Sequence, residues 1–354
     1  MPRKGIVRRR TNRVMVGPVA VGGESPVTVQ TMWKNPIDLQ DPSLPGRIDD
    51  LTDLGCDILR FSVPHLEAAA SLGQLIERVR VAIVADIHFD YRIALRCMDW
   101  PVAKIRVNPG NIGAKWKVEE VARKAKDRKI PIRVGINAGS LPKGLRGEVN
   151  VSGAMVKAAE EEMLVLQKLD FHDVIFSLKS SSIETTVEAN TIFSEKYAYP
   201  LHLGLTEAGP LVPGLVRSTT AIGALLRKGI GDTLRVSLSD SPDNEVRAGV
   251  EILKIYGLGS GVQIVSCPTC GRTVFDVTGF LEKAEPFLAG LKKDLVISIM
   301  GCPVNGPGEA KNADIGITGS EKYAVIFRGG NIVRRVPIEE ALQAFKEEVL
   351  REDT

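Results

Sequence analysis

Residues 103–137 read AKIRVNPGNIGAKWKVEEVARKAKDRKIPIRVGIN, and the fold follows from the unit that they form. The two ends of this segment, 103–108 and 131–137, are short apolar runs of the length expected for buried strands. Residues 116–129 between them have the apolar spacing of an amphipathic helix. Two strands separated by one helix predict a parallel strand-helix-strand unit.

The same unit recurs along the chain. Its apolar runs are 27–31, 57–62, 81–86, 103–108, 131–137, 173–179, 201–206 and 233–237, and the helix-like segments between them include 66–80, 116–129, 151–169 and 246–256. Eight strand-helix units of similar size predict an α/β fold with a closed parallel (β/α)8, or TIM, barrel. An open doubly wound sheet is the rival fold, but no G-x-G-x-x-G follows the first strand.

The strand-helix alternation stops at the Gly/Ser-rich segment 257–261. We therefore expect a barrel domain over residues 1–257 and a smaller α+β domain over residues 258–354. In the second domain, strands are predicted at 262–265, 295–300, 314–318 and 323–327, and helices at 280–293 and 338–351.

The composition is that of a soluble globular protein. Hydrophobic residues make up 44% of the 354 residues and charged residues 25%, while the net charge is only +3. A basic segment at residues 3–13 is more typical of a tail that leads into the first strand than of a nucleic-acid-binding arm. We expect no signal peptide, no transmembrane helix and a cytoplasmic location. Five cysteines suit a reducing compartment, with Cys56 and Cys97 predicted to be buried apolar groups.

Four of the eight strands carry an arginine between apolar neighbours, and a lysine ends a fifth strand. These cations are Arg60, Arg106, Arg133, Arg235 and Lys179. Parallel barrel strands are normally apolar, and a buried guanidinium without a partner is strongly unfavourable. By strand alternation, the residues that share the face of the arginines are Ser62, Asn108, Gly135 and Ser237. Convergent cations at the carboxyl ends of barrel strands predict a site for a di- or polyphosphate.

An internal layer of salt bridges is the alternative explanation of these cations. Acidic residues in the strands are too few to pair all five, although Asp86 and Glu207 could pair some. Asp86 and His88 end the third strand in ADIHFD and could hold a substrate hydroxyl or phosphate, or His88 could be a structural hydrogen-bonding residue. Glu207, in GLTEAG after the seventh strand, is a candidate proton donor or acceptor.

A metal site is predicted in the second domain. SCPTCG at 266–271 contains a C-x2-C turn formed by Cys267 and Cys270, and GCPVNGPGE at 301–309 supplies Cys302 from a separate loop. Three thiolates in proline-containing loops favour a cubane iron-sulfur cluster, for which Glu309 is a plausible and exchangeable oxygen ligand. A structural zinc knuckle with an incidental Glu309 is the alternative.

Together these motifs resemble one family, the 4-hydroxy-3-methylbut-2-enyl diphosphate synthases of the methylerythritol phosphate route to isoprenoids. The motifs are ADIHFD (85–90), KIRVNPGN (104–111), GINAGSL (135–141), LHLGLTEAG (201–209), SCPTCGRT (266–273) and GCPVNGPGEA (301–310). The resemblance covers nearly the whole chain, and several independent motifs in order are far more specific than one C-x2-C. The chain has no room for the extra middle domain of plant-type members and resembles the short bacterial form.

The resemblance implies an iron-sulfur oxidoreductase that reductively opens and dehydrates 2-C-methyl-D-erythritol 2,4-cyclodiphosphate. It implies that a [4Fe-4S] cluster is held by Cys267, Cys270, Cys302 and Glu309, and that Glu207 manages protons while Glu309 yields its iron to substrate. It implies a diphosphate site built from Arg60, Arg106, Arg133, Lys179, Arg235 and Ser237, with Asn108 and Asn137 in support, beside the strand-end residues Asp86 and His88 named above. It also implies ferredoxin or flavodoxin as electron donor and a head-to-tail homodimer with shared active sites.

Two other functions compete with this one. One is a radical or pterin-linked methyl-transfer barrel enzyme. The radical type would carry C-x3-C-x2-C near the first strand, and this chain lacks that motif. A zinc-knuckle protein that binds RNA through its basic tail should have aromatic residues among the basic ones. The tail has none, and such a protein would leave the barrel arginines unexplained.

Overall fold

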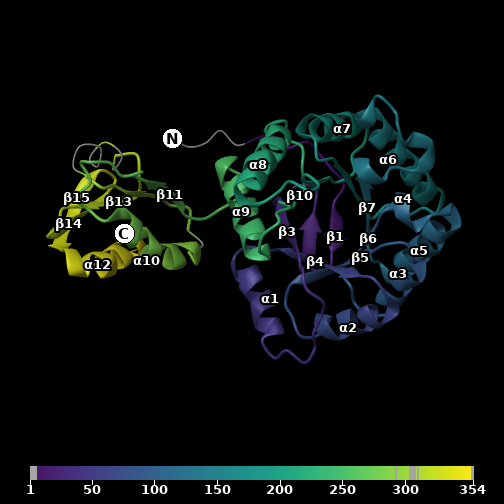
Figure 1. The fold of residues 1–354 in the computed structure, drawn as a ribbon, viewed down its shortest axis with the longest axis horizontal. Helices are drawn as coiled ribbons and strands as arrows, with labels where there is room; N and C mark the ends of the chain where they lie inside the picture. The colour runs from purple at the N-terminus through teal and green to yellow at the C-terminus, as the bar shows by residue number, and fades with distance from the viewer. Residues whose placement is uncertain (1–5, 292, 303–307, 309–310, 352–354) are drawn as a thin grey trace. The chain divides into compact units, whose positions relative to one another are not determined.

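The computed structural model describes residues 6–291, 293–302, 308 and 311–351. The chain divides into two compact units, Lys4–Gly259 and Ser260–Thr354 (Figure 1). Each unit has its own hydrophobic core. Among the described residues, none of the helices combines the length and the apolar composition that a membrane crossing requires.

The first unit is the predicted TIM barrel. Its eight parallel strands are β3 (Thr28–Met32), β4 (Ile58–Val63), β5 (Ala82–Ile87), β6 (Lys104–Val107), β7 (Ile132–Asn137), β8 (Val174–Lys179), β9 (His202–Leu203) and β10 (Thr233–Leu234). They are paired in the order β8-β7-β6-β5-β4-β3-β10-β9. A parallel bridge between Phe176 and Leu201 joins the two ends of this order and closes the barrel.

Helices surround this sheet in Figure 1. The longer ones are α1 (Leu44–Asp53), α2 (Leu66–Ile76), α3 (Tyr91–Cys97), α5 (Lys115–Arg128), α6 (Val151–Lys168), α7 (Ile183–Lys196), α8 (Leu211–Arg227) and α9 (Pro242–Ile255). Helix α9 begins where its sequence requires, because Pro242 suits the first helical position and the Ser241 side chain accepts a hydrogen bond from the Asn244 amide. This start places the residues of its first turn beside β10.

Strands β9 and β10 are shorter than the predicted runs 201–206 and 233–237. Gly204 ends β9 with a φ of +148°, and a Cβ there would lie 2.4 Å from the Arg235 carbonyl oxygen and 2.7 Å from Lys179 Nζ. Only glycine tolerates this approach. The regular pairing therefore stops where the backbone comes close to two of the predicted cations.

A hairpin that the sequence did not predict precedes the barrel. Strands β1 (Val14–Val16) and β2 (Val19–Val21) pair antiparallel. Their valines pack on residues at or near the amino ends of barrel strands, including Ile58, Ala82 and Ala103. The hairpin thus closes the amino end of the barrel and leaves the carboxyl end for a site.

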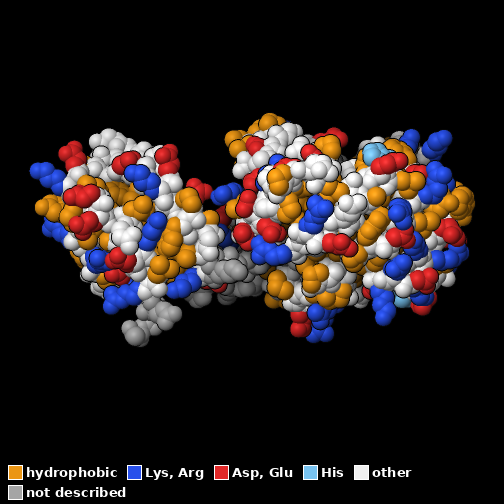
Figure 2. All heavy atoms as spheres, turned by 90° about the horizontal axis from the view of Figure 1, so that it is seen from below, with side chains coloured by type: hydrophobic (Ala, Val, Ile, Leu, Met, Phe, Trp, Pro, Cys, Tyr) orange, Lys and Arg blue, Asp and Glu red, His pale blue; other side chains and the backbone are white. Residues whose placement is uncertain are grey.

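The basic segment before this hairpin is attached to the barrel. Arg8 forms an ion pair with the buried Asp232 at 2.8 Å. Arg9 donates hydrogen bonds to the carbonyl oxygens of Tyr197 and Tyr199, at 2.8 and 2.6 Å. These two arginines are therefore engaged by the barrel itself. On the face in Figure 2, acidic and basic side chains are interspersed, in keeping with the small net charge.

The second unit contains a five-stranded sheet in the order β11-β12-β13-β14-β15. The strands are β11 (Gln263–Ser266), β12 (Val296–Ile299), β13 (Ile315–Gly319), β14 (Tyr323–Arg328) and β15 (Asn331–Pro337), and the helices are α10 (Val277–Ala289) and α12 (Ala341–Leu350). Strands β11 to β13 are parallel and the last pairs are antiparallel. Phe280 of α10 and Phe345 of α12 meet edge to face in the core, with ring centroids 5.3 Å apart. The predicted α+β class is confirmed, with β15 as an additional strand.

Candidate active site

The carboxyl ends of the barrel strands surround a cavity of about 240 Å³. Eight predicted site residues line it, namely Arg60, Arg106, Arg133, Asn137, Lys179, Glu207, Arg235 and Ser237. Ser177, Leu205 and Thr206 complete the lining. Residues from six strands or strand ends thus converge on one cavity, as strand alternation predicts.

The cations of this cavity are largely buried. Arg133 is 1% exposed and Lys179 is 7% exposed. Burial, reinforced by repulsion from neighbouring guanidinium groups, holds the pKa of Arg133 and of Lys179 well below their ordinary values. Burial also lowers the pKa of Arg60, to about 9. The free protein therefore concentrates positive charge at an electrostatic cost.

Two buried carboxylates offset part of this charge. Asp86 accepts a hydrogen bond from Arg106 Nη1 at 2.9 Å and lies 3.5 Å from Arg60 Nε. Burial alone would raise the pKa of Asp86, but Arg60 and Arg106 outweigh it and hold that pKa well below its ordinary value. Glu245 of α9 forms the second pair, at 2.9 Å from Arg235 Nε.

Arg133 and Lys179 have no such partner. Within the described part of the chain, no carboxylate lies within ion-pairing distance of either side chain, and Arg133 Nε and Nη1 have no hydrogen-bond partner. Glu207, which was expected to be able to pair a cation, forms no ion pair with a described residue. A layer of internal salt bridges therefore accounts for only some of the cations, and the remaining two are suited to an anionic ligand.

Asp86, His88 and Asn108 lie beside the cavity, behind its cationic lining. His88 Nε2 is 3.3 Å from Arg106 Nη1, and its Nδ1 is 3.3 Å from Asn111 Nδ2. Asn108 Nδ2 donates a hydrogen bond to Ser140 Oγ at 2.9 Å. These contacts suit them to orienting Arg106 and the neighbouring loops.

Glu207 has an uncommon backbone conformation. Its φ is +53°, in the left-handed region that non-glycine residues rarely adopt. The loop before it is fixed by a hydrogen bond from the Thr206 amide to the Ser180 carbonyl oxygen, at 3.1 Å. Constrained backbone of this kind often occurs at functional sites, and here it directs an exposed carboxylate to line the cavity.

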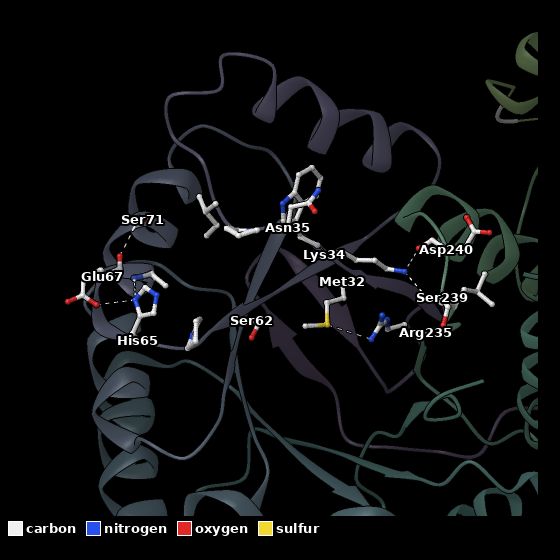
Figure 3. Close-up of a pocket in the computed structure, with 16 residues that line it drawn as sticks. Met32, Lys34, Asn35, Ser62, His65, Glu67, Ser71, Arg235, Ser239 and Asp240 are labelled. Atoms are coloured by element: carbon white, nitrogen blue, oxygen red, sulfur yellow. Dashed lines mark hydrogen bonds and ion pairs between the residues drawn. The ribbon is translucent and has the colours of Figure 1, made fainter. Parts of the chain in front are cut away.

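A second and larger cavity, of about 730 Å³, shares Arg235 with the first. Figure 3 shows it between the loops that follow β3, β4 and β10. Ser62 lines this larger cavity and not the smaller one. Met32 lies between two of the arginines, with its Sδ 3.0 Å from Arg60 Nη2 and 3.7 Å from Arg235 Nη1. Sequence patterns did not indicate this cavity, because loops from three separate strands form it.

Sequence reasoning also missed two charged residues near the site. Lys104 is fully buried, its Nζ lies 3.4 Å from Gln30 Oε1, and burial holds its pKa well below the ordinary value. Strand alternation could have found it, since it lies two residues before Arg106. Glu245 had no comparable signal, because its contact with Arg235 depends on the packing of a helix on the barrel.

The predicted metal ligands lie in the second unit. Cys267 follows β11, and its amide donates to the Ile299 carbonyl oxygen of β12 at 2.9 Å. The Val274 amide donates to the Gly301 carbonyl oxygen at 2.9 Å, so the C-x2-C segment runs beside the residue that precedes Cys302. None of Cys267, Cys270 and Cys302 forms a disulfide with a described residue. Strand pairing therefore brings the two cysteine loops together.

The fourth proposed ligand, Glu309, lies outside the described residues. Within those residues, no three His, Cys, Asp or Glu side chains are grouped closely enough to hold a metal ion. The donor chemistry nevertheless fits an iron-sulfur cluster, because three cysteines follow two neighbouring parallel strands. Cys56 and Cys97 lie apart in the barrel, buried as predicted, and burial raises the pKa of each thiol to about 12.

Comparison with known proteins covers both units. The model of the GcpE TIM-barrel domain matches residues 11–250, and that of the GcpE protein C-terminal domain matches residues 263–351. The 4-hydroxy-3-methylbut-2-en-1-yl diphosphate synthase (flavodoxin) of Thermodesulfovibrio yellowstonii is 47% identical over 348 residues, which cover 97% of this chain and 99% of the relative. The protein of the same name from Treponema denticola is 46% identical over 352 residues, with 93% and 91% covered.

A solved structure agrees with the barrel. Plasmodium falciparum HPPK-DHPS with pteroate aligns with a TM-score of 0.51 at 10% identity, covering 70% of this chain and 50% of that one. This likeness concerns the fold alone. The two domain matches and the near full-length identity show that the chain belongs to the GcpE family of 4-hydroxy-3-methylbut-2-en-1-yl diphosphate synthases.

Proposed function

We propose that the protein converts 2-C-methyl-D-erythritol 2,4-cyclodiphosphate to (E)-4-hydroxy-3-methylbut-2-enyl diphosphate. The reaction takes up two electrons, opens the ring and releases one hydroxyl as water. The observation that carries the proposal is the cavity at the carboxyl ends of the barrel strands, in which Arg133 and Lys179 have no carboxylate partner among the described residues. A ligand with two phosphate groups would offset these charges, and the names of the relatives support that substrate class.

The barrel residues would bind and orient the substrate. Arg60, Arg106, Arg133, Lys179 and Arg235 supply charge, and Asn137 and Ser237 supply neutral hydrogen-bonding groups on the same cavity wall. Charge-charge interactions are stronger in a buried cavity than in water, so this arrangement favours the fixed positions that the reaction needs. Asp86, His88 and Asn108 would support this lining from behind. Glu207, on the cavity wall, would transfer the proton that the departing hydroxyl requires.

Residues 258–354 would form the cluster-binding domain, and residues 1–257 the substrate-binding domain. Cys267, Cys270 and Cys302, with Glu309 as the oxygen ligand, would hold a [4Fe-4S] cluster. When bound, the cluster would pass to the site, one at a time, the two electrons from the donor that the ring opening requires. Among the described residues none of these three cysteines forms a disulfide, which supports this role and also supports a reducing, cytoplasmic location.

The electron donor would be flavodoxin or ferredoxin, and the relatives' names favour flavodoxin. We further propose a head-to-tail homodimer in which the cluster-binding domain of one copy completes the barrel site of the other. This arrangement is motivated by the placement of the thiols and the cation cavity in different compact units.

Metal analysis tests the redox part of the proposal. The full chain, purified without oxygen, should contain about four irons and four acid-labile sulfides, with broad visible absorption. Arg133→Ala is the matched control, because it lies in the barrel and should leave iron, sulfide and spectrum unchanged. One zinc and no sulfide, persisting after anaerobic reconstitution with iron and sulfide, would overturn the proposed function.

A further inference from the structure

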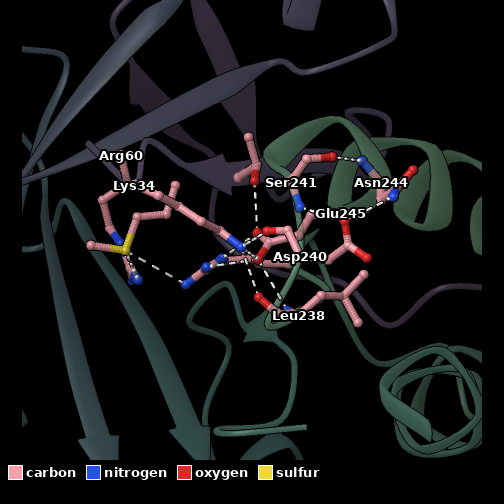
Figure 4. Close-up of polar contacts among 10 residues, drawn as sticks. Lys34, Arg60, Leu238, Asp240, Ser241, Asn244 and Glu245 are labelled. Carbon is pink, nitrogen blue, oxygen red and sulfur yellow. Dashed lines mark hydrogen bonds and ion pairs between the residues drawn. The ribbon is translucent and has the colours of Figure 1, made fainter. Parts of the chain in front are cut away.

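Glu245 is a buried carboxylate to which several elements of the barrel converge. It lies in the first turn of α9 and is 1% exposed. It accepts hydrogen bonds from a residue of β3 and from residues that directly follow β10. Its donors are Thr31 Oγ1 at 2.7 Å, Arg235 Nε at 2.9 Å, Arg235 Nη2 at 3.1 Å and the Leu238 amide at 3.0 Å. Figure 4 shows these contacts around the labelled Glu245. Both carboxylate oxygens are therefore fully engaged by donors that belong to separate parts of the barrel.

The two bonds from Arg235 fix the direction of its guanidinium. Glu245 binds the Nε and Nη2 edge, so rotation of the guanidinium would break two charge-assisted hydrogen bonds. Arg235 Nη1 lies on the other side, 3.7 Å from Met32 Sδ, and the side chain lines both cavities. The free edge of Arg235 is thereby presented to the cavities before any ligand arrives.

Glu245 also holds the loop that follows β3. Lys34 Nζ lies 3.1 Å from Glu245 Oε1, donates to the Leu238 carbonyl oxygen at 2.7 Å, and donates to the Asp240 carbonyl oxygen. One lysine thus joins the loop after β3 to the loop after β10, across the wall of the larger cavity in Figure 3. Since Arg235 and Lys34 share this carboxylate, the loop and the arginine are fixed together.

We propose that Glu245 is a positioning residue for the diphosphate site. It holds Arg235 and the loop after β3 in the geometry that binds the ligand. This inference rests on the proposed function and adds a residue that acts through Arg235 without touching the substrate. Burial raises the pKa of Glu245, but Arg235 and the hydrogen bonds outweigh burial, so that pKa is lowered and the group is ionised at neutral pH.

The direction in which Glu245→Gln changes the affinity for an anion distinguishes a positioning role from a purely electrostatic effect. Glu245→Gln removes a negative charge near five cations, and on charge alone it should strengthen the binding of an anion. If Glu245 acts by positioning, the same substitution weakens binding, because an amide cannot accept both Arg235 bonds. We expect the affinity of the full chain for inorganic pyrophosphate, measured by titration calorimetry, to fall about tenfold.

Three variants complete the test. Glu251→Gln removes an exposed carboxylate from the same helix and should leave the pyrophosphate affinity unchanged. Glu245→Asp keeps the charge but shortens the reach, so it should also weaken binding, and it serves if Glu245→Gln does not fold. In an Arg235→Ala background, Glu245→Gln should lower the affinity by less than about threefold, since Arg235 is absent and only the contact of Glu245 with the loop after β3 remains.

Turnover gives an independent result. Glu245→Gln should raise KM for the cyclodiphosphate more than it lowers kcat, because the residue acts on ligand binding. The inference would be overturned, and the proposed function would stand, if folded Glu245→Gln and Glu245→Asp bound pyrophosphate as tightly as the wild type or more tightly. A full tenfold loss caused by Glu245→Gln in the Arg235→Ala background would have the same consequence. A wild-type chain that binds neither pyrophosphate nor cyclodiphosphate would overturn the proposed function and, with it, this inference.

Discussion

Arg133 shows why the barrel is suited to an anion. Its guanidinium is almost fully buried, and two of its nitrogens have no hydrogen-bond partner among the residues that the structure describes. Burial of an unpaired charge is unfavourable, so the residue must reduce the stability of the ligand-free protein. A bound diphosphate would remove this penalty. The buried charge of Arg133 would therefore both lower the stability of the ligand-free protein and raise the affinity for the ligand.

Arg133→Met is therefore expected to have two opposite effects. It should raise the unfolding free energy of the ligand-free protein by about 1 kcal/mol or more, because methionine fills similar space without charge. It should also weaken cyclodiphosphate binding at least about tenfold. Thermal unfolding and calorimetry measure the two effects. Arg123→Met, at an exposed arginine paired with Glu119 and Glu120, is the control and should change neither quantity appreciably.

Lys179 gives a prediction for pH. Burial lowers its pKa in the folded protein, whereas in the unfolded chain it titrates near about 10.4. Between these two values the unfolded chain binds more protons, so the stability of the ligand-free protein should rise with pH across that window. A bound diphosphate favours the charged amine, so pyrophosphate affinity should fall over the same window.

Thermal unfolding from neutral to alkaline pH, with and without pyrophosphate, checks both slopes. Lys179→Met removes the titrating group and should flatten the rise in stability and reduce the fall in affinity. If the stability of the wild-type protein fell with pH, and by the same amount as the stability of Lys179→Met, the assigned role of Lys179 would be contradicted.

Strand β9 shows how a single backbone feature sets the position of the cations. Gly204→Ala introduces a Cβ that would lie 2.4 Å from the Arg235 carbonyl oxygen, at a φ that alanine disfavours. We expect a loss of at least about 2 kcal/mol in unfolding free energy, measured with urea, and weaker pyrophosphate binding as Arg235 and Lys179 move. Gly46→Ala is the control, because its Cβ would meet no atom within 4 Å and it lies in α1, where alanine should stabilise by up to about 1 kcal/mol.

The eight barrel strands were predictable because each is a short apolar run. The elements that escaped prediction lack that signal. Strands β1 and β2 have three residues each, and β15 is an edge strand whose NIVRRVP sequence is largely exposed. The cations were predictable because an arginine in a buried strand is anomalous. Glu245 was not, since a carboxylate in the first turn of a helix is common and only tertiary packing turns it toward Arg235.

In the proposed function, the residues for substrate binding and those for electron delivery belong to different units of the molecule. The cation cavity belongs to the unit Lys4–Gly259, and the three cysteines belong to Ser260–Thr354. Ring opening by electrons from a cluster requires that both reach one substrate. If the active site is shared between copies, each copy contributes one half to each of two sites.

Mixed dimers test this arrangement. Arg133→Ala disables the barrel, and Cys270→Ser disables the cluster site, so each variant alone should have little activity. A mixed dimer would retain one site with an intact barrel and an intact cluster, and mixing after subunit exchange should restore measurable activity. Anaerobic turnover of the mixture against the separate variants measures this. No recovery, with heterodimers shown to be present, would mean that each chain completes its own site.

The product of anaerobic turnover decides whether the protein is the proposed enzyme. The full chain, with its cluster reconstituted, would be incubated with the cyclodiphosphate and a strong reductant or reduced flavodoxin, and the products identified by mass spectrometry. We predict a linear allylic diphosphate that has taken up two electrons and two protons and released one water, a net loss of one oxygen atom, formed only when reductant is present and abolished by Cys270→Ser. Unchanged cyclodiphosphate in the presence of an intact cluster and reductant, or a product formed without reductant, would contradict the proposed reaction.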